Sequence, residues 1–314
     1  MTANAASERR SVRIETGARL HFGLLRTQAP FGGLGMMIDC PETVIRMKQS
    51  SRFHLDAELT KRATPIVERL TQKAGLKDVP SVEVVAEQLP PAHCGFGSGT
   101  QLSLALAEGF ANMFDLQLTE TELALDIARR GKRSKIGTRG YFAGGLFLEH
   151  GEPATVHRVE PPTDWRILVA LPNPLPSRTS GDEEASQFAA LSDPEKETSN
   201  ILLSIAENEI LPSVAEGDFG RFADAVTRYN HESGMLFSKV QGGAYNGKDV
   251  TELIETMKEN SAIGIGQSSW GPSVFAFCED ELSARKLGER LGTERADWFV
   301  AKPRNVGREI VGEA

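Results

Sequence analysis

The chain has 314 residues, of which 40% are hydrophobic, and its formal net charge is −8. This length and composition provide for a large buried core, in one large domain or in two closely joined domains. The negative charge argues against general binding of nucleic acid or anionic membranes, although a local basic site is compatible with it.

The cysteines and the first residues bear on where the protein works. Cys40, Cys94 and Cys278 cannot all pair within the chain and lack metal-site spacing, so we expect free thiols and a cytoplasmic location. Residues 1–10 are small and polar, without the apolar core of a signal peptide, and are predicted to form a disordered tail. No apolar run approaches the length of a membrane span, so no membrane association is expected.

Hydrophobic periodicity predicts a mixture of helices and strands with a break near residue 165. In the first half, we expect strands at residues 11–25, 33–39, 43–48, 81–86, 145–149 and 155–159, and helices at 64–74, 102–114 and 120–130. Thr119 and Glu122 form a capping-box sequence at the start of the last of these helices. In the second half, we expect helices at 195–211, 219–229, 250–260 and 280–291, and strands at 166–171, 273–278 and 298–301. We therefore predict an N-terminal domain over 11–165 and a C-terminal α+β domain over 166–314.

A glycine-rich turn at residues 93–101, HCGFGSGTQ, runs directly into one of the predicted helices. Gly95, Gly97 and Gly99 allow positive φ and close approach of a ligand, while Ser98 and Thr100 can cap the helix. Unbonded N–H groups at a helix N-terminus favour an anion, most often a phosphate. The turn lacks the signatures of a P-loop and of a dinucleotide-binding turn, so an ordinary structural loop remains an alternative.

A run of cations lies between residues 127 and 140. It contains no carboxylate, and its members are Arg129, Arg130, Lys132, Arg133, Lys135 and Arg139. A solvated basic face is the usual explanation of a charge run. Here three glycines interrupt the run, which favours a loop whose guanidinium groups converge on a phosphate.

Two further stretches carry polar groups that could line a pocket. The segment GIGQSSWGP, residues 264–272, combines a glycine turn with three polar side chains and a tryptophan ahead of a predicted strand. The segment RLHFGL, residues 19–24, places His21 near a strand end. A lone histidine there is more often structural than catalytic.

Together these stretches resemble one family. RLHFGLL (19–25), HCGFGSGTQ (93–101) and GIGQSSWGPSV (264–274), with RRGKRSKIG (129–137) and FAGG (142–145), resemble the GHMP kinase superfamily. Within it, they look most like the β-ribofuranosylaminobenzene 5′-phosphate synthase family, over nearly the whole chain. The resemblance implies a two-domain GHMP kinase-like α+β fold, in which the glycine-rich turn binds phosphate at a helix N-terminus.

The resemblance also implies an activity, in tetrahydromethanopterin biosynthesis. Members of the family are transferases that condense phosphoribosyl pyrophosphate with 4-aminobenzoate or 4-hydroxybenzoate. They release carbon dioxide and pyrophosphate and leave a carbon–carbon glycosidic bond. Mg²⁺ as cofactor, a cytoplasmic location and a homodimer are implied as well, whereas the acceptor and the metal ligands stay open.

The site residues follow from the matching stretches. We expect catalysis to involve Ser98, Arg133, His21 and Gln267. We expect substrate contacts from Arg19, Gly95, Gly97, Gly99, Thr100, Gln101, Arg129, Arg130, Lys132, Lys135, Ser268, Ser269 and Trp270. The turn and the basic loop, with Arg133, are assigned to the phosphosugar. Residues 267–270 are assigned to the aromatic acid, with Arg19 or His21 at its carboxylate.

Two other functions remain open. An ATP-dependent GHMP small-molecule kinase needs a carboxylate to hold its metal ion, and the basic run occupies the region where one is expected. The remaining candidates for that carboxylate are Glu108, Asp126 and Glu149. An inactive phosphosugar-binding protein would use the same basic loop without releasing pyrophosphate.

Overall fold

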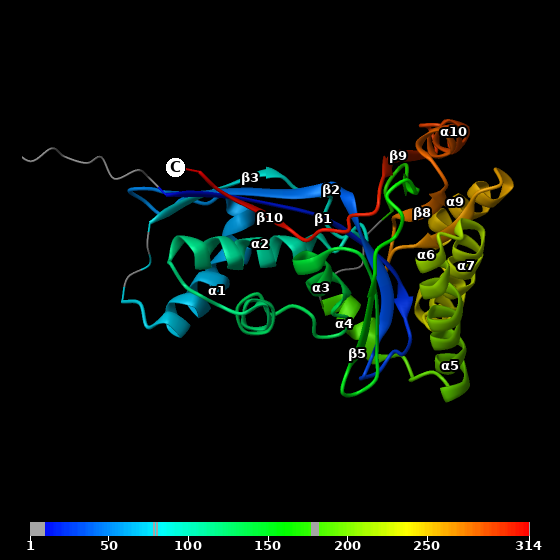
Figure 1. The fold of residues 1–314 in the computed structure, drawn as a ribbon, viewed down its shortest axis with the longest axis horizontal. Helices are drawn as coiled ribbons and strands as arrows, with labels where there is room; N and C mark the ends of the chain where they lie inside the picture. The colour runs from blue at the N-terminus through cyan, green and yellow to red at the C-terminus, as the bar shows by residue number, and fades with distance from the viewer. Residues whose placement is uncertain (1–9, 78, 80, 177–181, 314) are drawn as a thin grey trace, which may run out of the picture.

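A computed structural model describes residues 10–77, 79, 81–176 and 182–313 of the chain. Helices cover two β-sheets (Figure 1), which confirms the predicted α+β class. The predicted tail, except for Arg10, lies outside the described residues. Within the described ranges, no helix combines the length and apolarity that crossing a bilayer requires.

The first sheet is antiparallel and contains the first and the last strand. Its order is β10-β1-β2-β4-β5, and β3 also pairs with β2. The strands are β1 Ser11–Leu24, β2 Gly33–Gln49, β3 Val82–Gln88, β4 Leu146–His150, β5 Thr155–Val159 and β10 Glu309–Glu313.

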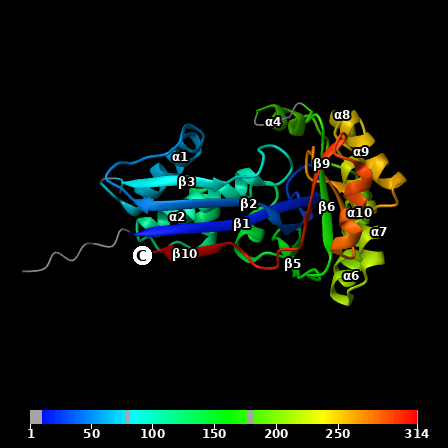
Figure 2. The ribbon, with the colours of Figure 1, turned by 90° about the horizontal axis from the view of Figure 1, so that it is seen from above.

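Strand β1 takes part in two hydrophobic cores. Val12 and Ile14 pack with α1 (Ala57–Ala74) and α2 (Ser98–Met113). Leu20 and Phe22, further along the strand, belong to the core that α7 (Phe219–Met235) helps to build. In Figures 1 and 2, β1 and β2 accordingly extend from the α1 and α2 end of the molecule toward α7. The middle of β1 therefore lies where the two halves of the molecule meet.

Strand β2 corrects the expectation of two strands at 33–39 and 43–48. It is continuous through Pro41, where we expected a break. Its pairing with β1 runs from Ser11↔Lys48 to Thr16↔Thr43 and resumes at Ala18↔Ile38, so a register shift falls beside the proline. Proline has no N–H to donate to the ladder, and a bulge is a place where that loss is tolerated.

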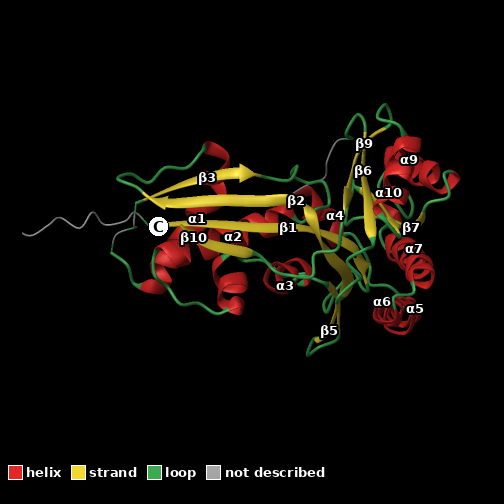
Figure 3. Cartoon of the chain, turned by 45° about the horizontal axis from the view of Figure 1, so that its top comes forward, coloured by secondary structure: helices red, strands yellow, loops and turns green. Residues whose placement is uncertain are grey.

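The second sheet has the order β7-β8-β6-β9. Its strands are β6 Arg166–Pro172, β7 Ile263–Gln267, β8 Val274–Cys278 and β9 Ala296–Ala301. Alternate residues of β6 face two cores. Leu168 packs in the core with α9 (Lys248–Glu259) and α10 (Glu281–Leu291), and Ile167 in the core shared with β1 and α7. Figure 3 shows these helices along the outer side of the sheet.

The turn predicted over residues 264–272 is in part a strand, β7. Two glycines in the strand obscured its alternation. A Cβ on Gly266 would lie 2.5 Å from the side chain of Asn230, so this glycine marks a close approach of α7 to the strand.

The predicted helices are present with shifted bounds. Helix α1 begins at Ala57 instead of residue 64, because Asp56 caps it by accepting the Leu59 N–H at 2.7 Å. The capping box is confirmed: Thr119 and Glu122 exchange hydrogen bonds and open the π-helical segment η1 (Glu122–Ile127). The helix expected at 195–211 consists of α5 (Lys196–Ile205), η2 (Ala206–Ile210) and α6 (Leu211–Glu216). The elements that we did not predict, apart from β7, are α3 (Ile136–Ala143), α4 (Asp182–Ala189), α8 (Ser238–Gln241) and β10.

The last strand returns across the domain boundary predicted at residue 165, and that boundary stays a prediction. Arg308, just before β10, pairs with Glu108 of α2, with Nη2 to Oε1 at 2.6 Å and Nε to Oε2 at 3.0 Å. The hydroxyl of Tyr141 donates to the same carboxylate at 2.7 Å. Glu108 is buried, so this network fixes the end of the chain against α2.

Replacing Arg308 with Met should therefore destabilise the protein. The change leaves the Glu108 carboxylate buried with only a neutral partner, which costs about 3 kcal/mol. That figure is the lower end of the usual range, because 24% of the Arg308 side chain is exposed. The free energy of unfolding in urea measures the effect. Arg285→Met is the matched control, since Arg285 is 59% exposed and pairs with Glu281 on the surface. Equal losses in the two variants would contradict this role of the network.

Candidate functional site

The glycine-rich turn leads into α2 as predicted, but its capping differs from the expectation. Gly95 and Gly97 have φ of 86° and 67°, and Gly97 is the N-cap without a side-chain hydrogen bond. The N–H groups of Thr100 and Gln101 bond to the Gly97 carbonyl, so those of Ser98 and Gly99 precede the first helical bonds. Ser98 and Thr100 line a hollow, and neither is the N-cap residue of the helix. The turn thus presents N–H groups and hydroxyls to a ligand.

A buried serine joins the three stretches that the sequence singled out. The hydroxyl of Ser268 accepts the His21 N–H at 3.0 Å and donates to the Gly95 carbonyl at 2.8 Å. The N–H of Arg19 donates to the carbonyl of Phe96 at 2.9 Å. A Cβ on Gly95 would collide with the carbonyl oxygen of Ser268, so only glycine permits this contact.

Two adjoining hollows lie on either side of this junction. The first, which we call the phosphate hollow, has a volume of about 720 Å³ and contains the glycine-rich turn. The second, the aromatic hollow, has a volume of about 400 Å³ and lies between the basic loop and the end of β1 on one side and α7 on the other. They share the lining residues Arg19, Thr100, Arg130, Ser269 and Trp270.

Cations converge on the phosphate hollow. Arg62 of α1 and Arg130 both donate to the hydroxyl of Ser103, at 3.3 and 3.0 Å. Burial, followed by the proximity of Arg62 and Arg69, lowers the pKa of Arg130 from its usual value. Like charges held this close favour binding of an anion, since an anion would offset their repulsion.

The aromatic hollow has a wall of three rings. Trp270 packs edge to face on Phe188 of α4 and on Phe237, with centroids 5.5 and 5.2 Å apart. The guanidinium of Arg133 lies 4.1 Å above the ring of Phe188. This hollow therefore offers three aromatic rings, with a cation over the face of one of them.

Arg129, Lys132 and Arg133 of the basic loop line the aromatic hollow and not the phosphate hollow, whereas Arg130 lines both. The assignment of Arg133 and its neighbours to the phosphosugar stays a prediction. Arg62, which we did not predict, lines the phosphate hollow.

His21 lines the aromatic hollow and is buried. Burial, and secondly the charge of Arg19, hold the pKa of His21 well below its usual range. Its Nε2 lies 3.1 Å from the hydroxyl of Ser134 in the basic loop. His21 can therefore exchange hydrogen bonds with a ligand but does not add a positive charge.

The side chain of Gln267 holds the loop that carries Ser269 and Trp270. Its Oε1 accepts the Asn246 N–H and its Nε2 donates to the Ser269 carbonyl, both at 2.7 Å. Asn230 of α7 donates to the Gln267 and Phe22 carbonyls, so α7 is bonded to both β7 and β1. These bonds fix the aromatic wall against the end of β1.

Most of the predicted site residues line the two hollows. They are Arg19, His21, Gly95, Gly97, Ser98, Gly99, Thr100, Arg129, Arg130, Lys132, Arg133, Gln267, Ser269 and Trp270. Three predicted residues line neither hollow. Gln101 is buried between Thr16 and the Gly137 carbonyl, Ser268 is buried at the junction, and Lys135 lies 3.6 Å from Glu149. A substrate contact for any of these residues stays a prediction.

Comparison with known proteins agrees with this geometry. The family model of the GHMP kinase N-terminal domain matches residues 59–143, and that of the GHMP kinase C-terminal domain matches residues 210–296. Together they cover more than half of the chain. The chain belongs to the GHMP kinase superfamily.

Relatives over nearly the whole chain carry one name. The β-ribofuranosylphenol 5′-phosphate synthase of Archaeoglobus fulgidus is 29% identical over 95% of this chain and 99% of its own. The synthase of the same name from Methanothermobacter thermautotrophicus is 27% identical over 95% of this chain and 98% of its own. The family resemblance inferred from the sequence is therefore confirmed.

Solved structures of two enzymes share the fold. The homoserine kinase of Cytophaga hutchinsonii aligns with a TM-score of 0.69 at 14% identity, covering 99% of this chain and 100% of its own. The mevalonate diphosphate decarboxylase of Enterococcus faecalis aligns with a TM-score of 0.67 at 15% identity, covering 98% of this chain and 100% of its own.

The carboxylates considered for a GHMP kinase lie away from both hollows. Glu108 pairs with Arg308, and Asp126 lies 3.2 Å from Lys73 on the surface. Glu149 lies 3.6 Å from both Lys135 and Arg139. Among the described residues that line the hollows, Asp249 in the first turn of α9 is the single acid.

The burial of His21 leads to a prediction about pH. In the folded state His21 stays neutral, whereas in the unfolded chain it takes up a proton below about pH 6.5. Its contribution to stability is therefore complete above that pH and is lost as the pH falls. Between pH 7 and 5.5, the wild type should lose about 1 kcal/mol more unfolding free energy than His21→Gln. Urea unfolding of both proteins across this range provides the test, and parallel curves would show that His21 is protonated in the fold.

Proposed function

We propose that the chain is a β-ribofuranosylphenol 5′-phosphate synthase. This transferase joins phosphoribosyl pyrophosphate to a 4-substituted benzoate and releases carbon dioxide and pyrophosphate. The relatives of that name align along almost their full length. The cofactor pathway implied by the resemblance, tetrahydromethanopterin biosynthesis, is part of this proposal.

The observation that carries the proposal is that two hollows with different linings adjoin and share five lining residues. One places a helix N-terminus, Arg62 and Arg130 around a space for phosphates. The other places Phe188, Phe237 and Trp270 around a space for an aromatic ring. Their shared residues surround the place where an anomeric carbon and a ring carbon would meet.

The reaction needs little from side chains beyond charge and position. The bond from the ribose anomeric carbon to the pyrophosphate oxygen breaks, and the electron pair leaves with pyrophosphate. The aromatic carbon that bears the carboxylate forms the new bond to the anomeric carbon. The electron pair of the bond to the carboxylate then returns to the ring, and carbon dioxide leaves. No net proton transfer is required.

The chain supplies stabilisation for the leaving group. The N–H groups of Ser98 and Gly99, with Arg62 and Arg130, would face the charge that develops on pyrophosphate. The aromatic wall, with Arg133 at its edge, would hold the benzoate in line for attack. Fixing two partners in such a geometry is worth about 7–11 kcal/mol of barrier in favourable cases.

We propose that Mg²⁺ binds in the phosphate hollow. This ion usually keeps several waters and binds one or two carboxylates together with substrate phosphates. Asp249, with the hydroxyl of Ser98, would supply the protein oxygens. The bound ion would add positive charge at the pyrophosphate.

The relatives' name also favours one acceptor. A ribofuranosylphenol is the product expected from 4-hydroxybenzoate, whereas 4-aminobenzoate would leave an aniline. We therefore propose 4-hydroxybenzoate as the acceptor. A homodimer in the cytoplasm, as the resemblance implies, completes the proposal.

If each hollow binds one substrate, an arginine substitution in one hollow should weaken the binding of that substrate only. Arg62→Met should raise the Michaelis constant for phosphoribosyl pyrophosphate, and Arg133→Met that for 4-hydroxybenzoate. Loss of a charge-assisted hydrogen bond is worth about 1.5–3 kcal/mol, so each rise should be roughly tenfold to a hundredfold. Steady-state kinetics that follow pyrophosphate release measure both constants in each variant.

The control for these variants is Arg285→Met, because this exposed arginine of α10 lines neither hollow. Both of its Michaelis constants should match those of the wild type. A result in which Arg62→Met and Arg133→Met each raise both constants equally would contradict the assignment of substrates to hollows.

A further inference from the structure

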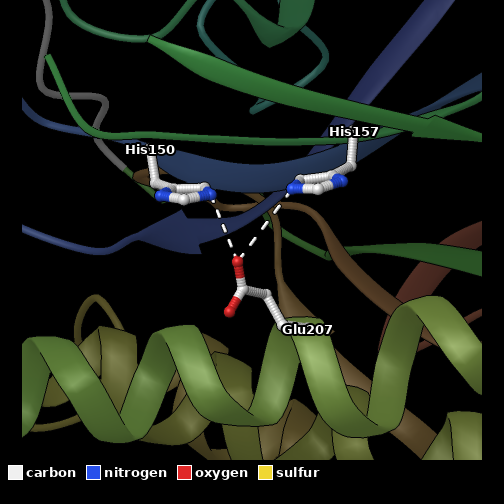
Figure 4. Close-up of side chains that lie close together, drawn as sticks. All are labelled: His150, His157 and Glu207. Atoms are coloured by element: carbon white, nitrogen blue, oxygen red, sulfur yellow. Dashed lines mark ion pairs between the residues drawn. The ribbon is translucent and has the colours of Figure 1, made fainter. Parts of the chain in front are cut away.

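A second cluster of ligating side chains lies apart from both hollows. His150 at the end of β4, His157 in β5 and Glu207 in η2 each bring a ligand atom within 4.8 Å of the other two (Figure 4). None of the three lines the phosphate hollow or the aromatic hollow. The proposed synthase reaction does not use them.

Strand pairing brings the two histidines together. Leu148 lies opposite His157 and Thr155 opposite His150, so the histidines are diagonal neighbours on adjacent strands. Residues two apart in a strand point to the same face, and both imidazoles therefore project from one face of the hairpin. Their rings are parallel within 5°, with centroids 5.8 Å apart.

The third group comes from the other half of the chain. Glu207 lies in the π-helical segment η2, between α5 and α6. Figure 4 shows its carboxylate pointing from the helix toward the gap between the two rings. Oε1 of Glu207 lies 3.2 Å from Nε2 of His150 and 4.0 Å from Nε2 of His157.

These separations are close to those around a metal ion. Ligand atoms at about 2.0–2.1 Å from a tetrahedral Zn²⁺ lie about 3.4 Å from one another. Nε2 of His150 is shielded from solvent, and its contact with Glu207 does not have the geometry of a hydrogen bond. The cluster thus holds three donor atoms at ligand spacing without a hydrogen bond that would satisfy this nitrogen.

We propose that His150, His157 and Glu207 bind a divalent transition-metal ion, with Zn²⁺ as the best match. Two imidazoles and a carboxylate, with a water in the fourth position, form a common zinc donor set. Imidazole nitrogen does not suit Mg²⁺, which selects oxygen ligands. His157 is 43% exposed and Glu207 37%, so solvent can reach the open position.

The bound ion would fasten the edge of the first sheet to the helices. Strand β5 forms one edge of that sheet. Segment η2 belongs to the run of helices between β6 and β7. Glu149, the neighbour of His150, accepts the Lys135 N–H at 3.1 Å at the end of the basic loop. A metal ion at His150 would therefore restrict the motion of β4, the strand whose Glu149 bonds to this loop.

The test uses the full-length protein after removal of bound metal with a chelator. Zn²⁺ is titrated in competition with a chromophoric chelator, and Co²⁺ is added separately so that its absorption spectrum reports the ligand geometry. We expect one Zn²⁺ per chain and a tetrahedral Co²⁺ spectrum. In His157→Ala and in Glu207→Gln, the affinity should fall by at least about tenfold, because each removes one of three protein ligands.

The matched control is His231→Gln, since His231 also lies beside a carboxylate, that of Glu232 at 3.3 Å, but no third potential ligand among the described residues joins this pair. This variant should bind Zn²⁺ as the wild type does. The replaced side chains are partly exposed, and circular dichroism checks that each variant is folded. Failure of the wild type to bind Zn²⁺ stoichiometrically would overturn the proposal. So would equal affinity in His157→Ala, Glu207→Gln and the wild type. Neither outcome depends on the synthase activity.

Discussion

A buried hydroxyl, that of Ser268, accepts a hydrogen bond from the N–H of His21 and donates one to the carbonyl of Gly95. Through these two bonds, the segment after β7 fixes both the last part of β1 and the glycine-rich turn. The turn leads directly into α2, whose first residues line the phosphate hollow. Gly95 is required at this junction because any side chain there would strike the backbone of Ser268. The site is thus built from three segments that are distant in the sequence, at the meeting point of two cores.

The distribution of charge supports the same account. The chain is acidic overall, yet its described acids lie mostly outside the two hollows, where they serve structure: Glu108 anchors the last strand and Glu149 holds the basic loop. Inside the phosphate hollow, Arg62 and Arg130 share one hydroxyl between them. Holding like charges together costs stability in the free protein, and a bound pyrophosphate would recover it. This arrangement suits release of an anionic leaving group.

Much of the site could be predicted because its segments have unusual composition. Clustered glycines, a carboxylate-free basic run and a polar segment beside a tryptophan each indicate a constrained or ligand-binding loop in a single sequence. Alternation and capping residues likewise placed most strands and the start of η1.

Other features could not be predicted because they depend on long-range packing. Arg62 lies on an amphipathic helix whose pattern reports only which face is buried, and nothing nearby marks it as facing a ligand. Gln101 bonds to the Gly137 carbonyl and the Lys135 N–H to Glu149, and neither contact is indicated by the local sequence. Strand β10 pairs with β1 across almost the entire chain, and no local pattern reports such a partner.

The most direct test of the central claim follows both products of one reaction. Purified protein is supplied with Mg²⁺, phosphoribosyl pyrophosphate and 4-hydroxybenzoate labelled at its carboxyl carbon. Carbon dioxide and pyrophosphate are then measured together, with parallel reactions that contain 4-aminobenzoate or ATP alone. A synthase of this kind should form equal amounts of both products, and only when the phosphosugar and 4-hydroxybenzoate are both present. ATP consumption without carbon dioxide, or phosphosugar binding without either product, would contradict it.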